Sequence, residues 1–162
     1  MLNKTVAGLL NDQINKEFYS AYLYLEMNNY FMERGLEGFA HWYEIQAHEE
    51  CEHGMKIYQY LHDEECHVSL QTIARPDVQF SCDMDVLRQA LAHEESVTES
   101  INNIAAVAFE ENDYRTMQFL DWFIAEQAEE EVNAREMITK LILYGEEAQG
   151  LYLLDHELAK RK

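Results

Sequence analysis

Residues that interrupt helices are nearly missing from this chain, which has one proline and six glycines among its 162 residues. Proline breaks helices and glycine weakens them, and both are normally more frequent. Good helix formers such as alanine, leucine and glutamate are abundant instead. Hydrophobic residues make up 48% of the chain, which is enough for the core of one domain of this length. We therefore expect an all-α fold in a single domain that covers residues 1–162.

Helical periodicity divides the chain into four long segments and a short one. Asn3 or Thr5 is a suitable N-cap for the first helix, and Asp83 suits the start of the third. The segment after Tyr144, where Gly145 ends the fourth helix, is short and amphipathic. The expected helices cover approximately residues 3–34, 37–64, 83–110, 114–144 and 146–160.

The lengths of the connections predict the topology. Helices one and two, and helices three and four, are joined by a few residues, so each pair forms an antiparallel hairpin. The connection over 65–82 is long and contains the only proline, Pro76. A helix of ~26 residues is ~39 Å long, and an extended chain of about 18 residues can reach ~60 Å. This connection can therefore cross the whole bundle, which makes helices two and three parallel and gives a four-helix bundle with one long crossover over about 3–144.

Each long helix carries a glutamate on its apolar face, near the middle of the helix. The apolar positions follow a three-four spacing, and the glutamates at those positions are Glu17, Glu50, Glu94 and Glu130. Burying a charged carboxylate without a partner costs roughly several kcal/mol of folding free energy. The inner positions of the helices contain no lysine or arginine that could form an ion pair with these glutamates. Two divalent cations would balance the four charges. The sequence therefore predicts a dinuclear metal site in the bundle core.

The ligand types narrow the choice of metal. Glu50 and His53 lie one turn apart on the same helix face, so they can bind a common metal pair. Carboxylate oxygens suit hard cations, and an imidazole nitrogen moves the preference towards iron, manganese or zinc. The spacing alone does not choose among these three metals.

One set of residues resembles the ferroxidase centre of the bacterial non-haem ferritins: Glu17, Tyr24, Glu50, His53, Glu94, Gln127 and Glu130. The resemblance covers essentially the whole chain, including the crossover and the terminal helix. It implies that Glu17, Glu50 and His53 bind one iron, and that Glu50 as a bridge, with Glu94 and Glu130, binds the second. Gln127 would lie beside the second iron. Tyr24 would hydrogen-bond near the centre and donate an electron, although spacing alone equally fits an aromatic core residue.

Two departures from related families shape this interpretation. Bacterioferritins and symmetric di-iron bundles have a second Glu-x-x-His motif on helix four, where this chain has Gln127-x-x-Glu130. We therefore expect an asymmetric site, with tighter iron binding on the side of His53. Bacterioferritins bind haem through a methionine of helix two, at a position that is Cys51 here, so haem is not expected. The chain also has no cysteine-rich segment like that of the rubrerythrin-like peroxidases.

A second acidic cluster flanks the first one, because Glu49, Glu126 and Glu129 lie one residue away from the apolar positions. These residues resemble the third iron site of bacterial ferritins, which faces the inner cavity. Runs of glutamate are also usual on solvated helix faces, and the sequence does not separate the two interpretations.

The resemblance implies a function: the protein would oxidise Fe(II) with O2 and store the ferric product inside a hollow shell of twenty-four identical subunits. In the family, the terminal helix packs around a four-fold axis of that shell. The only direct support for assembly in this sequence is that Leu151, Leu154 and Leu158 form an apolar face that needs to be covered.

The remaining features indicate where the protein works and what it does not bind. The net charge of −19 disfavours nucleic acid and anionic membranes. Cys51, Cys66 and Cys82 are odd in number and lack the spacing of a zinc site or a disulfide framework. We find no secretory signal and no segment that approaches the ~20 apolar residues of a membrane span. We expect a soluble protein of the reducing cytoplasm.

Three alternatives use the same bundle differently. The first is a non-storage di-iron or di-manganese oxidase or peroxidase, which would not need a shell. The second is a sequestering subunit without catalysis, against which the intact ligand set argues. The third is a helical interaction module without metal, which leaves the four core glutamates unexplained.

Overall fold

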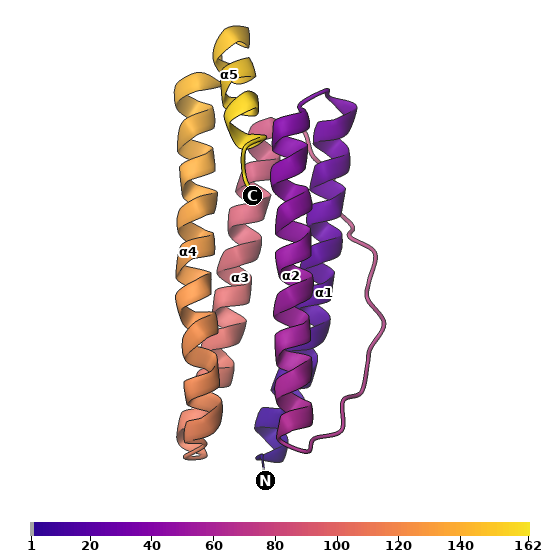
Figure 1. The fold of residues 1–162 in the computed structure, drawn as a ribbon, viewed down its shortest axis with the longest axis vertical. Coiled ribbons are helices and arrows are strands. Elements are labelled where there is room, and N and C mark those ends of the chain that lie inside the picture. The colour runs from indigo at the N-terminus through magenta and orange to yellow at the C-terminus, as the bar shows by residue number, and fades with distance from the viewer. Residues whose placement is uncertain (1) are drawn as a thin grey trace.

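The computed structural model describes residues 2–162, and within them the chain forms helices only (Figure 1). The all-α prediction is therefore confirmed, with four long helices and a short fifth. The elements are α1 (Lys4–Glu33), α2 (Glu37–Asp63), α3 (Asp83–Glu110), α4 (Tyr114–Tyr144) and α5 (Ala148–Leu158).

Local sequence explains where the long helices begin. Of the two expected caps for α1, Asn3 takes this role, because its Oδ1 accepts hydrogen bonds from the backbone N–H groups of Thr5 at 2.7 Å and Val6 at 3.4 Å. Asp113 caps α4 in the same way through the N–H of Thr116. The turn between α1 and α2 contains Gly35 at φ 73°, a left-handed conformation that glycine adopts at little cost.

The connection between α2 and α3 runs along the outside of α1 and joins opposite ends of the bundle (Figure 1). Polar side chains of α1 hold it in place: Asn11 Nδ2 donates to the carbonyl oxygen of Ser69 at 3.0 Å, and Asn15 Nδ2 donates to that of Thr72 at 3.1 Å. Helices α1 and α2 form one hairpin, and α3 and α4 form the other. The predicted long crossover is therefore confirmed.

Two apolar clusters fill the bundle, one towards each end. One cluster includes Met27, Phe31, Phe39 and Leu87, and the other includes Leu10, Ile57, Leu61, Ile101 and Leu120. The buried glutamates lie between them in sequence on every long helix. Apolar side chains therefore enclose a polar layer in the middle of the bundle.

Helix α5 corrects one expectation. Leu154 and Leu158 need no other subunit to cover them, because they are only 3% and 2% exposed and pack against the same chain. The helix folds back over the start of α2, where Asp155 Oδ1 accepts hydrogen bonds from the N–H groups of Gly38 and Phe39 at 2.8 and 3.0 Å. The exposed large hydrophobic residues of α5 are instead Tyr152, at 68%, and Leu153, at 58%.

Among the described residues, we find no helix that is both long enough and apolar enough to cross a membrane.

Candidate metal centre

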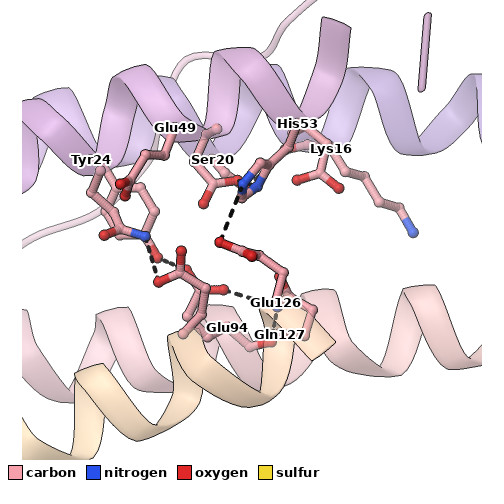
Figure 2. Close-up of polar contacts among 12 residues, drawn as sticks. Lys16, Ser20, Tyr24, Glu49, His53, Glu94, Glu126 and Gln127 are labelled. Carbon is pink, nitrogen blue, oxygen red and sulfur yellow. Dashed lines mark hydrogen bonds and ion pairs between the residues drawn. The ribbon is translucent and has the colours of Figure 1, made fainter. Parts of the chain in front are cut away.

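The structure brings the seven expected core-site residues together in the polar layer. All seven side chains are at most 5% exposed, and they come from all four long helices: Glu17, Tyr24, Glu50, His53, Glu94, Gln127 and Glu130. In Figure 2, side chains from facing helices, among them His53, Glu94 and Glu126, point into the space between those helices. The three-four spacing of the sequence thus identified the inward-facing positions correctly.

The first group of possible ligands consists of Glu17, Glu50 and His53. Their ligand atoms lie within 4.8 Å of one another, and all three side chains are buried. His53 Nδ1 lies 3.5 Å from Glu50 Oε2, one turn away on α2. Two oxygens and one nitrogen at this spacing can hold one cation of the iron, manganese or zinc type.

The second group adds α4 to the centre. His53, Glu126 and Glu130 also offer ligand atoms within 4.8 Å of one another, and His53 Nε2 lies 4.0 Å from Glu126 Oε1 (Figure 2). The two groups overlap, because His53 belongs to both of them. A neutral imidazole has only one nitrogen with a free lone pair, so His53 would bind one cation and the remaining carboxylates would serve any second one.

Hydrogen bonds hold the carboxylates on the side of α3 and α4. The Tyr24 hydroxyl donates to Glu94 Oε1, and Gln127 Nε2 donates to Glu94 Oε2 at 3.0 Å (Figure 2). Gln46 Nε2 donates to Glu130 Oε2 at 2.7 Å. Neutral donors of this kind orient a carboxylate and leave its charge uncompensated.

Two carboxylate oxygens have no partner within the described residues. They are Glu17 Oε2 and Glu50 Oε1, both buried without a hydrogen bond. Leaving such an atom unpaired in the core costs free energy, of order 1–3 kcal/mol or more for a charged group. A metal cation would satisfy both atoms, and this is the structural observation that most directly favours a metal at this place.

The titration behaviour of the glutamates agrees with this interpretation. Burial is the main cause that raises the pKa of Glu17, Glu50 and Glu94, and the neighbouring carboxylates contribute to each shift. Burial likewise raises the pKa of Glu130 to about 7. Without a cation these residues hold protons at pH values where ordinary glutamates have lost them, so a divalent metal would compete with protons for the site.

The three residues of the second acidic cluster lie in different surroundings. Glu126 is half-buried and belongs to the group with His53 and Glu130. Glu49 is half-buried and forms an ion pair with Arg161 at 2.5 Å. Glu129 is exposed. The structure thus brings Glu126 close to His53 and Glu130 and places a cationic side chain beside Glu49.

Sequence reasoning gave no role to two amides that contact the carboxylates. Gln13 Nε2 donates to Glu17 Oε1 at 2.8 Å, and Gln46 contacts Glu130 as described above. Gln46 follows the three-four spacing of α2, and Gln13 lies one turn before Glu17, so a search for every inward polar residue could have found both. The C-terminal Arg161 had no comparable signal.

A four-helix bundle with one long crossover and a buried carboxylate centre defines a class of metal-binding helical proteins. Residues 7–143 match the family described as "Ferritin-like domain", and this match covers most of the chain. The protein belongs to the ferritin family.

Two curated relatives illustrate how far the likeness extends. The chain is 41% identical over 155 residues to a bacterial non-heme ferritin of Campylobacter jejuni. This alignment covers 96% of this chain and 93% of the relative. It is 40% identical over 161 residues to a bacterial non-heme ferritin of Staphylococcus epidermidis, with 99% and 97% covered. Among solved structures, an open pore ferritin from the hyperthermophilic archaeon Archaeoglobus fulgidus is similar, with a TM-score of 0.97, 37% identity and 100% of both chains covered.

Proposed function

We propose that this protein is an iron-storage ferritin that oxidises Fe(II) with O2 in its polar layer. One observation supports this most strongly: four buried glutamates and a histidine converge from α1, α2, α3 and α4, and two of their oxygens have no partner. No lysine or arginine of the described residues forms an ion pair with Glu17, Glu50, Glu94 or Glu130. Two Fe(II) ions, which are the substrate, would supply the missing positive charge.

The ligand sets follow the two sides of the layer. Glu17, Glu50 and His53 would bind the first iron. Glu50 as a bridge, Glu94 and Glu130 would bind the second, with Gln127 next to it. Because only the first set contains a histidine that is one turn from a glutamate, we infer that the first iron is bound more tightly.

The protein's own groups have distinct tasks in this reaction. Each Fe(II) gives up one electron, so the pair supplies two electrons to one O2. The glutamates lose protons when the iron binds, and their charges then offset the charge that the iron gains on oxidation. The apolar clusters at either side limit the access of water. Tyr24 is hydrogen-bonded to Glu94, and in this proposal it would orient that carboxylate and could donate a further electron.

Storage requires more than one subunit. From the resemblance to the bacterial non-haem ferritins, we propose that the chain assembles into a shell of twenty-four copies. Glu49, Glu126 and Glu129 would form a third position for iron on its way to the mineral. The exposed apolar residues of the subunit, among them Phe109 and Leu153, are available for contacts between copies.

The three cysteines of the chain are unpaired in the described residues, which fits the reducing cytoplasm.

Aerobic loading of the metal-free protein with Fe(II) tests the proposal. The wild type is compared with Glu50→Ala, which loses the shared ligand, and with Glu52→Ala, a matched change at an exposed position of α2. We expect fast oxidation in the wild type and in Glu52→Ala, background oxidation in Glu50→Ala, and iron that elutes with a large shell.

Two other results would change the conclusion. Iron that is oxidised quickly but stays on a small species would indicate a non-storage di-iron oxidase. Oxidation at the background rate in all three proteins would refute the ferroxidase proposal.

A further inference from the structure

The C-terminal end of the chain folds back onto α2, and Arg161 makes the central contacts. Its Nη2 donates to Glu49 Oε2 at 2.5 Å and its Nη1 donates to Gln46 Oε1 at 2.8 Å. The same Nη1 lies 3.3 Å from the backbone oxygen of Trp42, and the guanidinium carbon lies 4.1 Å from the centroid of the Trp42 ring. The carbonyl oxygen of Arg161 lies 2.9 Å from Nε2 of His41.

These contacts exceed those of an ordinary surface ion pair. The Arg161 side chain is only 15% exposed, and its planar guanidinium combines an ion pair, a stacked aromatic ring and a hydrogen bond to a buried amide. Exposed pairs contribute little because solvent screens them and both side chains lose freedom. Here Glu49 and Trp42 fix the guanidinium in one orientation.

The buried amide of Gln46 connects this arginine to the metal centre. A guanidinium has only donors, so the oxygen of Gln46 must face Arg161. The amide nitrogen of Gln46 then points the other way and donates to Glu130 Oε2 at 2.7 Å. With the amide reversed, its oxygen would face a carboxylate oxygen and its NH2 group would face the guanidinium, and both contacts would be repulsive.

The surroundings of this connection are nearly closed. Gln46 and Glu130 are 4% and 5% exposed. A cavity of about 20 Å³ lies beside them, and its lining includes Trp42, Gln46, Glu94 and Glu130. Arg161 contacts two residues of this lining, Trp42 and Gln46, from outside the cavity.

We propose that Arg161 is a positioning residue for the metal centre: through Gln46 it fixes the Glu130 carboxylate and so sets the affinity of the second metal position. This inference rests on the proposed function only in taking Glu130 as a ligand. The arginine is held in place by Glu49, Trp42 and His41. It fixes the orientation of the Gln46 amide, and this amide in turn orients the Glu130 carboxylate. The last residues of the chain thereby take part in building a site at the middle of the bundle.

Titration of the metal-free protein with Co(II), whose visible absorption reports its ligands, tests this role. We compare the wild type with Arg161→Gln and with Lys162→Gln, a matched loss of charge at an exposed residue that makes no hydrogen bond or ion pair within residues 2–162. Outer residues that orient ligands change metal affinity by roughly 10–100-fold, and Arg161 acts one hydrogen bond further out. We therefore expect Arg161→Gln to weaken the second Co(II) roughly three- to tenfold, with the first Co(II) and Lys162→Gln unaffected.

A double-mutant comparison separates positioning from a general effect of the tail. In Gln46→Leu the connection is missing, so adding Arg161→Gln should not weaken the second Co(II) any further. An equally large effect of Arg161→Gln in both backgrounds would overturn the proposal, as would an unchanged second affinity in the single variant. Failure of the wild type to bind two Co(II) per subunit would instead contradict the proposed function, so the two failures are distinguishable.

Discussion

The raised pKa of Glu130 leads to a prediction about the stability of the metal-free protein. Glu130 is 5% exposed, and its burial, together with the Glu94 carboxylate, raises its pKa from 4.5 to about 7. The folded state therefore holds this proton more tightly than the unfolded chain does. The protonated carboxyl contributes stability at pH values below 4.5, and this contribution is lost as the pH rises through about 7.

The two pKa values give the size of the effect. The pKa of Glu130 is 4.5 in the unfolded chain and about 7 in the folded protein. Because of this difference, the free energy of unfolding decreases by about 2.5 kcal/mol between pH 5 and pH 8. For a chain of this length, that corresponds to a decrease of roughly 5–10 °C in Tm. Glu130→Gln keeps the shape of the side chain but cannot ionise, so it should not show this loss.

Thermal unfolding of the metal-free proteins at pH 5 and pH 8 measures the difference, at one protein concentration because assembly changes Tm. The control is Glu129→Gln, which removes a neighbouring charge at an exposed position of α4. We expect Glu130→Gln, but not Glu129→Gln, to lose less stability than the wild type between the two pH values. Equal losses in the wild type and in Glu130→Gln would refute the argument that an uncompensated buried carboxyl controls this pH dependence.

Three further predictions concern other parts of the structure. Tyr24→Phe removes a donor from a buried carboxylate, and metal titration should show an affinity lower by roughly tenfold or more. Gly38→Ala should displace α5, because an added Cβ would lie 1.7 Å from the carbonyl oxygen of Asp155, and faster proteolysis of the C-terminal segment would reveal this. Leu154→Ala should destabilise the subunit by about 2–5 kcal/mol in denaturant unfolding, whereas Leu153→Ala at an exposed position should cost much less.

Periodicity allowed the inward positions of the long helices to be predicted. A three-four spacing fixes which face of a helix points to the core, and the lengths of the loops fix which helices pair. This is why the sequence pattern predicts that Glu17, Glu50, Glu94 and Glu130 lie together, and why it predicts the long crossover.

Contacts made by the C-terminal segment were beyond this kind of reasoning. The interaction of Asp155 with the start of α2 and that of Arg161 with Gln46 and Glu49 depend on how the chain turns after Gly145. Spacing within one helix carries no information about such a turn. The same limitation explains why the sequence showed that Leu154 and Leu158 need to be covered but not that their own chain covers them.

Crystals soaked anaerobically in Fe(II) and measured at the iron absorption edge would test the central claim most directly. The account predicts two anomalous peaks per subunit in the polar layer, one beside Glu17, Glu50 and His53, and one beside Glu94 and Glu130. Iron bound only at the protein surface, with no peak among these five side chains, would contradict it.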